Sequence, residues 1–177
     1  FEFWEQWSTD VLDYAHAKGK DEFFMFGEVY DADPVKLAPY VRKTDMNSIL
    51  DFTFQSSAVS YASGNSAKGL QTLFAGDDRY TTADSSATAL PTFLGNHDMG
   101  RIGYFMQSTD APLARDELAH ELMFLSRGQP VVYYGDEQGF AGLGGDKSAR
   151  QSLFATQSAE YADQNLVTGQ AAGSTDR

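Results

Sequence analysis

Cysteine is absent from this 177-residue sequence, and histidine occurs only three times. The missing cysteines exclude disulfide bonds, a thiolate nucleophile and any zinc site that uses cysteine ligands. Two of the histidines, His16 and His120, have no partner at a metal-binding spacing, and each is expected on the solvated face of a helix. The sequence therefore predicts no metal site and no cofactor in this segment.

Long apolar runs and positive charge are also scarce. No run approaches the roughly 18–20 apolar residues that span a membrane, and the opening FEFWEQWSTD contains neither a signal peptide nor a starting methionine. The net charge of −12 offers no positive field for nucleic acid and is repelled by anionic membranes. We therefore expect neither nucleic acid nor a membrane as a partner. We also expect the chain to be a processed product or a piece of a longer protein.

Two widespread enzyme motifs are missing as well. The run GLGGDKS at 142–148 has neither a strand before it nor the Gly-Lys-Ser/Thr ending of a phosphate-binding loop. No Gly-x-Ser-x-Gly sequence is present. These absences disfavour phosphate-binding enzymes and hydrolases with a serine on a nucleophile elbow.

Apolar and aromatic residues are plentiful, at 42% and 14%, which is enough for a substantial core. Four short apolar runs are typical of buried strands and lie at 23–29, 48–54, 89–95 and 129–135. Helical patterns lie between them, at 3–16, from Asp33-Pro34 onward, at 56–75 in two pieces, and from Pro112 to just before Gly128. Helical spacing in the first of these predicts that Trp4 and Trp7 belong to the core.

Strands alternate with helices along the chain, which predicts an α/β fold with a parallel sheet and crossover helices. We expect one domain over residues 1–150. The residues that follow, 151–177, are expected to be a loop-rich, weakly patterned tail of the same domain. No repeat or linker indicates a second domain.

Polar side chains that can bind a ligand or transfer a proton lie at the ends of three of the predicted strands. Glu28 ends the first run, Asn96–Asp98 end the third, and Asp136–Glu137 follow the fourth. The carboxyl ends of parallel strands meet at one edge of a sheet, where binding and catalysis gather. We therefore expect these side chains to share a site, whereas Asp51, inside the second run, stays unexplained.

The chemistry of this site follows from its carboxylates. A glutamate at the end of an apolar strand is expected to be partly desolvated, which raises its pKa and suits a general acid near neutral pH. A second carboxylate that stays ionised completes the pattern of glycoside hydrolysis, and His97 can donate a hydrogen bond to a sugar hydroxyl. Simpler explanations stay open, because Glu28 can pair with a loop arginine or lysine and His97 can be a buried residue bound to a backbone carbonyl.

The runs FFMFGEV (23–29) and FLGNHDMGRIG (93–103) resemble two signatures of the α-amylase family of glycoside hydrolases. The run GQPVVYYGDEQGF (128–140) resembles the strand that closes the barrel in that family, and EFWEQW (2–7) resembles the helix after its nucleophile strand. The order of the runs is also that of the family. The resemblance covers about residues 1–150.

This resemblance implies a TIM (β/α)8 barrel, a retaining mechanism, and an α-glucan such as starch or a maltooligosaccharide as substrate. It assigns Glu28 as the acid/base catalyst and Asp98 as the carboxylate that holds ring hydroxyls and stabilises the transition state. His97 would hydrogen-bond the same sugar. Asn96 and Arg150 are placed with the substrate-binding residues, although Asn96 also suits the shaping of a strand end and Arg150 the ordering of a loop.

Parts of the family pattern are missing from the sequence. The family's nucleophile is an Asp in a Gly-x-Arg-x-Asp run followed by Lys-His, and no such run is present. The signature with the early Asp and Asn-His is absent too, as is the usual calcium-binding region. We therefore expect a partial barrel, roughly strands five to eight, that is inactive alone, with calcium restricted to the full-length protein. Export to an extracellular or periplasmic space fits a starch-degrading enzyme, but these residues do not indicate it.

Two alternatives remain open. A catalytically inactive relative of the same fold could have a binding role, but the joint presence of Glu28, His97 and Asp98 disfavours it. An unrelated doubly wound α/β domain could bind a small ligand, but the sequence has no phosphate-cradling first turn.

Overall fold

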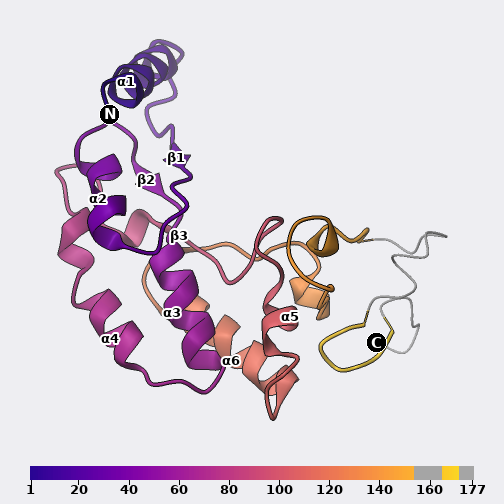
Figure 1. The fold of residues 1–177 in the computed structure, drawn as a ribbon. Helices are drawn as coiled ribbons and strands as arrows, with labels where there is room; N and C mark the ends of the chain where they lie inside the picture. The colour runs from indigo at the N-terminus through magenta and orange to yellow at the C-terminus, as the bar shows by residue number, and fades with distance from the viewer. Residues whose placement is uncertain (154–164, 172–177) are drawn as a thin grey trace.

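The computed structural model describes residues 1–153 and 165–171, and in these residues helices alternate with short strands (Figure 1). The helices are α1 (Glu2–Ala17), α2 (Pro34–Arg42), α3 (Phe52–Ala62), α4 (Lys68–Phe74), α5 (Ile102–Met106) and α6 (Pro112–Leu125). The strands are β1 (Phe26–Gly27), β2 (Ser48–Ile49), β3 (Pro91–Thr92) and β4 (Gln129–Pro130). Helix α1 and the 165–171 segment lie at opposite ends of the molecule.

All the strand pairing is parallel, as the alternation of strands and helices predicts. Strand β1 pairs with β2, with Phe26 opposite Ser48, and β3 pairs with β4, with Pro91 opposite Gln129. The amide of Asp51 donates to the carbonyl of Pro91 at 3.0 Å and connects the two pairs. The four strands therefore follow one another in chain order, side by side and in one direction.

The strands are shorter than the apolar runs that predict them. Each ladder is only two residues long, and among the described residues β1 and β4 each have a partner on one side only. A strand gains backbone hydrogen bonds from both neighbours, so an open edge shortens the ladder. Phe24 and Phe26 in the first run are accordingly 46% and 55% exposed.

The second predicted strand, at 48–54, is wrong in its second half. The ladder ends at Ile49 and helix α3 begins at Phe52. The cause is Asp51, whose Oδ1 accepts from the amide of Phe54 at 2.8 Å and caps the helix. The carboxylate of Asp51 also pairs with Arg127, which in turn binds Asp77. The polar residue that interrupts the apolar run is therefore a helix start.

Several predicted helix boundaries agree with the structure, whereas α3 begins four residues before the predicted helix and α5 was not predicted. Asp33 caps α2 by accepting from Val35 N at 2.9 Å, and Pro34 takes the first helical position. Helices α3 and α4 are separate around Gly64, as the sequence predicts. Helix α6 begins at Pro112 and Gly128 follows its end with a φ of +111°.

Two apolar clusters hold the described residues together. The α2 cluster contains Met25, Leu37, Ala38, Val41, Met46, Ile49, Tyr80, Ala87 and Leu90. The α3–α6 cluster contains Phe54, Ala58, Ala62, Leu70, Leu73, Leu94, Ile102, Met106, Ala119 and Met123. Helix α2 contacts β2, and helix α3 contacts β3.

Helix α1 does not bury the tryptophans that its spacing predicts to be core residues. Trp4 and Trp7 are 42% and 43% exposed, whereas Ser8 and Ala15 are buried. The buried side faces the segment after α2, where the amide of Asp45 donates to Ser8 Oγ at 3.2 Å. Helix α1 lies at one end of the molecule (Figure 1), and both tryptophans stay partly exposed there although Trp4 lies one turn before Ser8, so the prediction that they belong to the core is wrong.

The described part of the predicted tail is packed against the domain. The amide of Val167 donates to the carbonyl of Gly139 at 2.7 Å, and Phe140 and Leu166 form a β-bridge. Leu166 and Val167 are buried. The rest of the tail lies outside the described residues, so the division at residue 150 stays a prediction. No helix in residues 1–153 or 165–171 is long and apolar enough to cross a membrane.

Candidate active site

Glu28 directly follows β1, at the carboxyl end predicted from the sequence. The ladder continues beside it, because Leu50 N donates to the carbonyl of Gly27 at 3.0 Å. The side chain of Glu28 is exposed, so the expected partial desolvation is wrong for the described residues. No described lysine or arginine forms an ion pair with it, which also removes the simpler explanation of a structural pair.

A row of aromatic rings crosses the carboxyl ends of the strands. Tyr30, two residues after Glu28, packs edge-on against Phe52 with ring centroids 5.1 Å apart. Phe52 packs in the same manner against Phe93, again at 5.1 Å. Phe93 lies five residues before Asp98 on the β3 side. The row therefore connects the segments that carry the two predicted catalytic carboxylates.

Asn96 shapes the loop that follows β3. Its backbone exchanges two hydrogen bonds with Gly100, at 3.0 and 3.1 Å. Its side-chain Oδ1 accepts from the amides of Asp98 and Met99, at 2.9 and 2.8 Å. This turn closes the loop on itself. Asn96 therefore has the strand-shaping role that the sequence suggested, and its amide oxygen is engaged in that role.

The side chains of His97 and Asp98 project from this loop into solvent. Their side chains are 58% and 52% exposed, and His97 Nε2 lies 3.4 Å from Asp98 Oδ2. The alternative of a buried His97 bound to a carbonyl is therefore wrong. Exposure leaves both side chains free to reach a ligand.

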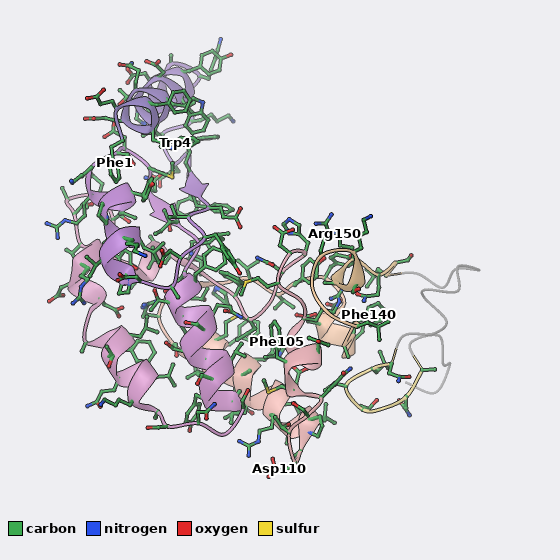
Figure 2. All side chains as sticks on the ribbon, viewed as in Figure 1. Phe1, Trp4, Phe105, Asp110, Phe140 and Arg150 are labelled. Carbon is green, nitrogen blue, oxygen red and sulfur yellow. The ribbon has the colours of Figure 1, made fainter. Side chains whose placement is uncertain are left out.

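Arg150 joins these two residues from a distant part of the chain. Its Nη2 donates to Asp98 Oδ1 at 2.9 Å, and its Nε donates to the carbonyl of His97 at 3.1 Å. Nη2 also lies 2.8 Å from Asp146 Oδ1. Figure 2 shows Arg150 and Phe140 on the side of the molecule opposite α1. The structure thus brings together Asn96, His97, Asp98 and Arg150.

Asp136 and Glu137 follow β4 but differ in exposure. Asp136 is buried and its Oδ1 accepts from Arg101 Nη1 at 2.7 Å. Burial raises the pKa of Asp136 to about 7, although the hydrogen bond from Arg101 acts in the opposite direction. Asp136 therefore has a structural role, and the expectation that it touches the site is wrong. Glu137 is exposed and accepts from the amide of Gly135 at 2.7 Å, and its contact with the site stays a prediction.

Sequence reasoning missed Arg101 and Asp146. Arg101 is fully buried, and the only signal for it was a charged residue between Gly100 and the apolar Ile102. Asp146 was missed because its contact with Arg150 depends on a 3-10 turn over Asp146–Ala149. The pair has the i, i+4 spacing of helical ion pairs, but no helix was predicted there. The contacts of Arg101 join residues 33 to 50 positions apart and have no local spacing rule.

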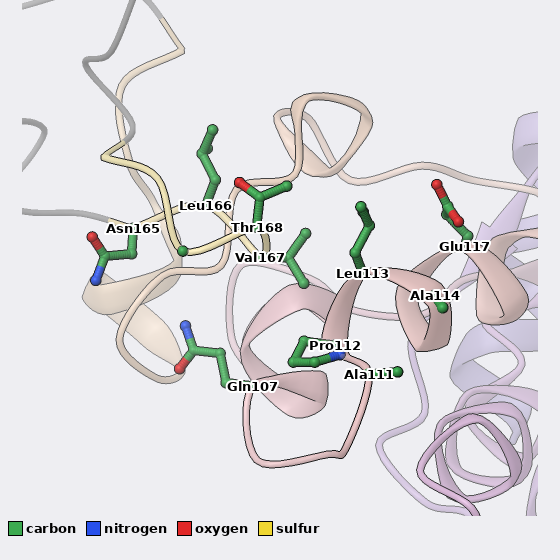
Figure 3. A pocket seen from close by; sticks show the side chains of 11 residues that line it. Gln107, Ala111, Pro112, Leu113, Ala114, Glu117, Asn165, Leu166, Val167 and Thr168 are labelled. Atoms are coloured by element: carbon green, nitrogen blue, oxygen red, sulfur yellow. The ribbon is translucent and has the colours of Figure 1, made fainter. Parts of the chain in front are cut away.

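A pocket of about 780 Å³ lies elsewhere, between the start of α6 and the 165–169 turn (Figure 3). Its walls include Leu113, Glu117 and Thr168, and none of the predicted site residues lines it. In residues 1–153 and 165–171, no three histidine or acidic side chains are grouped so that they could hold a metal ion. The candidate site is therefore the carboxyl edge of β1–β4.

The chain matches one protein family over almost its whole length. The chain matches the family described as "Alpha amylase, catalytic domain" over residues 1–175. It is 56% identical over 174 residues to an alpha-amylase of Streptomyces lividans, which covers 94% of this chain and 19% of the relative. The chain thus spans about a fifth of that relative's length.

Solved structures show the same fold. An Anoxybacillus alpha-amylase superposes with a TM-score of 0.71 at 26% identity, covering 89% of this chain and 33% of that one. The alpha-amylase of Geobacillus thermoleovorans in complex with acarbose gives 0.73 at 23% identity, with 97% and 36% covered. These matches confirm the predicted partial TIM barrel. The chain therefore belongs to the α-amylase family of glycoside hydrolases.

Proposed function

We propose that the protein containing this chain is a retaining glycoside hydrolase that cleaves α-glucosidic bonds in starch or maltooligosaccharides. One observation carries the proposal: Glu28 follows β1, and His97 and Asp98 follow β3, on the same edge of a parallel partial barrel. Membership of the α-amylase family and a Geobacillus thermoleovorans relative solved with acarbose support the substrate class.

Glu28 is the proposed acid/base catalyst. It would protonate the leaving glycosidic oxygen and then deprotonate the attacking water. Glu28 is exposed in the described residues. In the complete protein, the rest of the barrel together with the bound sugar would exclude water from this carboxyl, as a general acid requires.

Asp98 is the proposed stabiliser of the transition state, with His97 and Arg150 beside it. The carboxylate of Asp98 can accept hydrogen bonds from ring hydroxyls, and Arg150 orients it through the 2.9 Å contact. His97 would donate to the same sugar from its ring nitrogen. A third carboxylate must act as nucleophile, and the sequence of this chain offers no Gly-x-Arg-x-Asp run for it. We propose that the nucleophile, and any calcium site, lie outside these residues.

Substrates with different leaving groups test the role of Glu28 in the complete protein. We expect Glu28→Gln to lower kcat on an unactivated maltooligosaccharide by about 10²–10⁴-fold, because general acid assistance is lost. Substrate binding should remain, and an aryl maltoside with an acidic phenol should lose much less rate in the glycosylation step. Glu22→Gln is the matched control, because Glu22 is an exposed glutamate six residues before Glu28.

Equal activity of Glu28→Gln and the wild type would contradict the acid/base assignment. A wild-type protein that binds maltooligosaccharides without cleaving them would favour an inactive relative with a binding role.

A further inference from the structure

Arg101 is the largest fully buried side chain of the described residues, with 0% exposure. A buried guanidinium is costly unless it is paired and hydrogen-bonded. Arg101 donates from Nη1 to the carbonyl of Tyr134 at 2.6 Å and to Asp136 Oδ1 at 2.7 Å, and from Nε to Gln151 Oε1 at 2.7 Å. One side chain thus connects the loop after β3 to the segment after β4 and to residue 151.

Three aromatic rings enclose the same guanidinium. Its central carbon lies 4.5 Å from the ring centre of Tyr133, 5.0 Å from that of Tyr134 and 5.5 Å from that of Phe140. Cations favour the faces of aromatic rings, more so when water is excluded. The rings and the hydrogen bonds together leave the guanidinium little freedom.

The tyrosines of this enclosure also hold the backbone on both sides of Arg150. Tyr133 donates from its hydroxyl to the carbonyl of Ala149 at 3.1 Å, and Tyr134 donates to the carbonyl of Gln151 at 2.8 Å. Arg101 adds its contact with the side chain of Gln151. Arg150 therefore extends from a short segment that is anchored at the residue before it and the residue after it.

Arg150 then reaches back to the loop from which Arg101 starts. Its contacts are Asp98 Oδ1 at 2.9 Å and the carbonyl of His97 at 3.1 Å. Arg101 lies three residues after Asp98. The two arginines thus link the same two segments. Arg101 holds the segment that contains Arg150, and Arg150 holds the loop that carries Asp98.

We propose that Arg101 is a positioning residue for Asp98, acting through Gln151 and Arg150 rather than by contact with the substrate. The proposal rests on the proposed function, because it gives Asp98 a role in the transition state. It assigns to a buried residue an effect on catalysis as well as on stability. If Arg101 lost its contacts with Tyr134, Asp136 and Gln151, the segment around Arg150 would be free to move. Arg150 would then no longer hold Asp98 in its orientation.

A double-mutant cycle in the complete protein tests this route. Arg101→Lys keeps the positive charge, but a lysine cannot make the three hydrogen bonds of the Arg101 guanidinium. We expect this variant to lower kcat roughly 10- to 100-fold with little change in KM, because a displacement of Asp98 by about 1 Å has an effect of this size. In an Arg150→Ala background the same change should lower kcat by less than about 3-fold, because coupled residues are not additive.

Two further variants separate positioning from stability. Gln151→Met removes the acceptor of Arg101 Nε together with the hydrogen bond that Gln151 Nε2 donates to the carbonyl of Ser148. It should lower kcat in the same way with a smaller loss of Tm, which keeps the test open if Arg101→Lys fails to fold. Asp77→Asn weakens a half-buried arginine pair away from the site, at Arg127, and should lower Tm without lowering kcat.

The outcomes distinguish the two proposals. A wild-type protein that does not cleave maltooligosaccharides overturns the proposed function. An active wild type in which Gln151→Met leaves kcat unchanged, or in which the Arg101 and Arg150 effects multiply independently, overturns the positioning role alone.

Discussion

Gly95 marks the closest backbone approach in the candidate site. A Cβ atom at this position would overlap the carbonyl oxygen of Gly100 and lie 3.1 Å from the Cα of Arg101. These are backbone atoms of the loop that carries Asp98, so they cannot rotate away as a side chain would. The absence of a side chain at Gly95 is therefore what lets the loop close between Asn96 and Gly100.

We expect Gly95→Ala to destabilise the protein by about 1–3 kcal/mol, as overpacking does. It should also lower kcat/KM on a maltooligosaccharide by at least about 10-fold, because the loop must move. Gly69→Ala is the control, since a Cβ there meets only ordinary contacts and lies in helix α4. Thermal unfolding and steady-state kinetics of both variants check the expectation, and an active, stable Gly95→Ala protein would contradict it.

At the level of single residues, the sequence predicts positions better than environments. Glu28 and Asp98 could be placed at strand ends because each follows an apolar run. Their exposure could not be predicted, because it depends on what faces the inner side of the strands. Asp51 was visibly out of place in its run, but its partner Arg127 lies 76 residues later in the chain. Contacts of this range have no local signature.

Helix α6 carries an ionisable pair between its turns. His120 Nδ1 lies 2.9 Å from Asp116 Oδ1, and both side chains are largely buried. The sequence prediction of a solvated His120 is therefore wrong, because α6 packs its Asp116, Ala119 and Met123 side inward. Burial lowers the pKa of His120, but the hydrogen bond and charge of Asp116 outweigh burial, and the net shift is upward.

The sign of this shift predicts how stability depends on pH. A histidine whose pKa is raised on folding stabilises the protein fully below its unfolded pKa of about 6.5, and the contribution is lost as the pH rises through the folded pKa. We expect His120→Gln to be less stable than the wild type at about pH 5 and to approach it near pH 9. Asp136 also titrates nearby, but it is present in both proteins.

Urea unfolding of the two proteins across this pH range measures the effect. His16→Gln is the control, since His16 is exposed on α1 and lies on a different helix from the Asp116–His120 pair. If the difference in the free energy of unfolding between His120→Gln and the wild type grew as the pH rose, the expected upward shift in the pKa of His120 would be contradicted.

At the level of elements, the starts of α2 and α6 were predictable, whereas the start of α3, the short helix α5 and the strand lengths were not. The starts of α2 and α6 are indicated locally by Asp33-Pro34 and Asp110–Pro112, because capping and proline placement depend on adjacent residues. The ladders of β1 and β4 depend on neighbours along the sheet. The run at 23–29 therefore contributes only Phe26–Gly27 to the β1–β2 ladder.

The whole molecule exposes an apolar inner face. A groove of about 510 Å³ runs along the strands and is lined by Phe24, Phe26, Leu50, Ala89, Pro91, Gln129 and Val131. In a closed barrel the interior is filled by side chains from all strands. The side chains of β1–β4 fill only part of that interior, and the groove is the part that the described residues leave open.

We expect the isolated chain to be inactive on α-glucans and to self-associate, because unpaired strand edges and exposed apolar surface favour association. Light scattering and binding of a hydrophobic dye measure this, and Phe26→Ser should reduce both signals. Purified chain that is monomeric and cleaves a chromogenic maltooligosaccharide would contradict this expectation.

The two apolar clusters have an order in time as well as in space. The buried residues of the α2 cluster lie between Met25 and Leu90, whereas the α3–α6 cluster is complete only at Met123. A ribosome that adds about 5–20 residues per second needs about 2–7 s for the 33 residues between positions 90 and 123. The strand before Glu28 can therefore be packed before the last residues of the second cluster leave the ribosome. A translational pause once Leu90 has left the ribosome would delay the second cluster without interrupting the first.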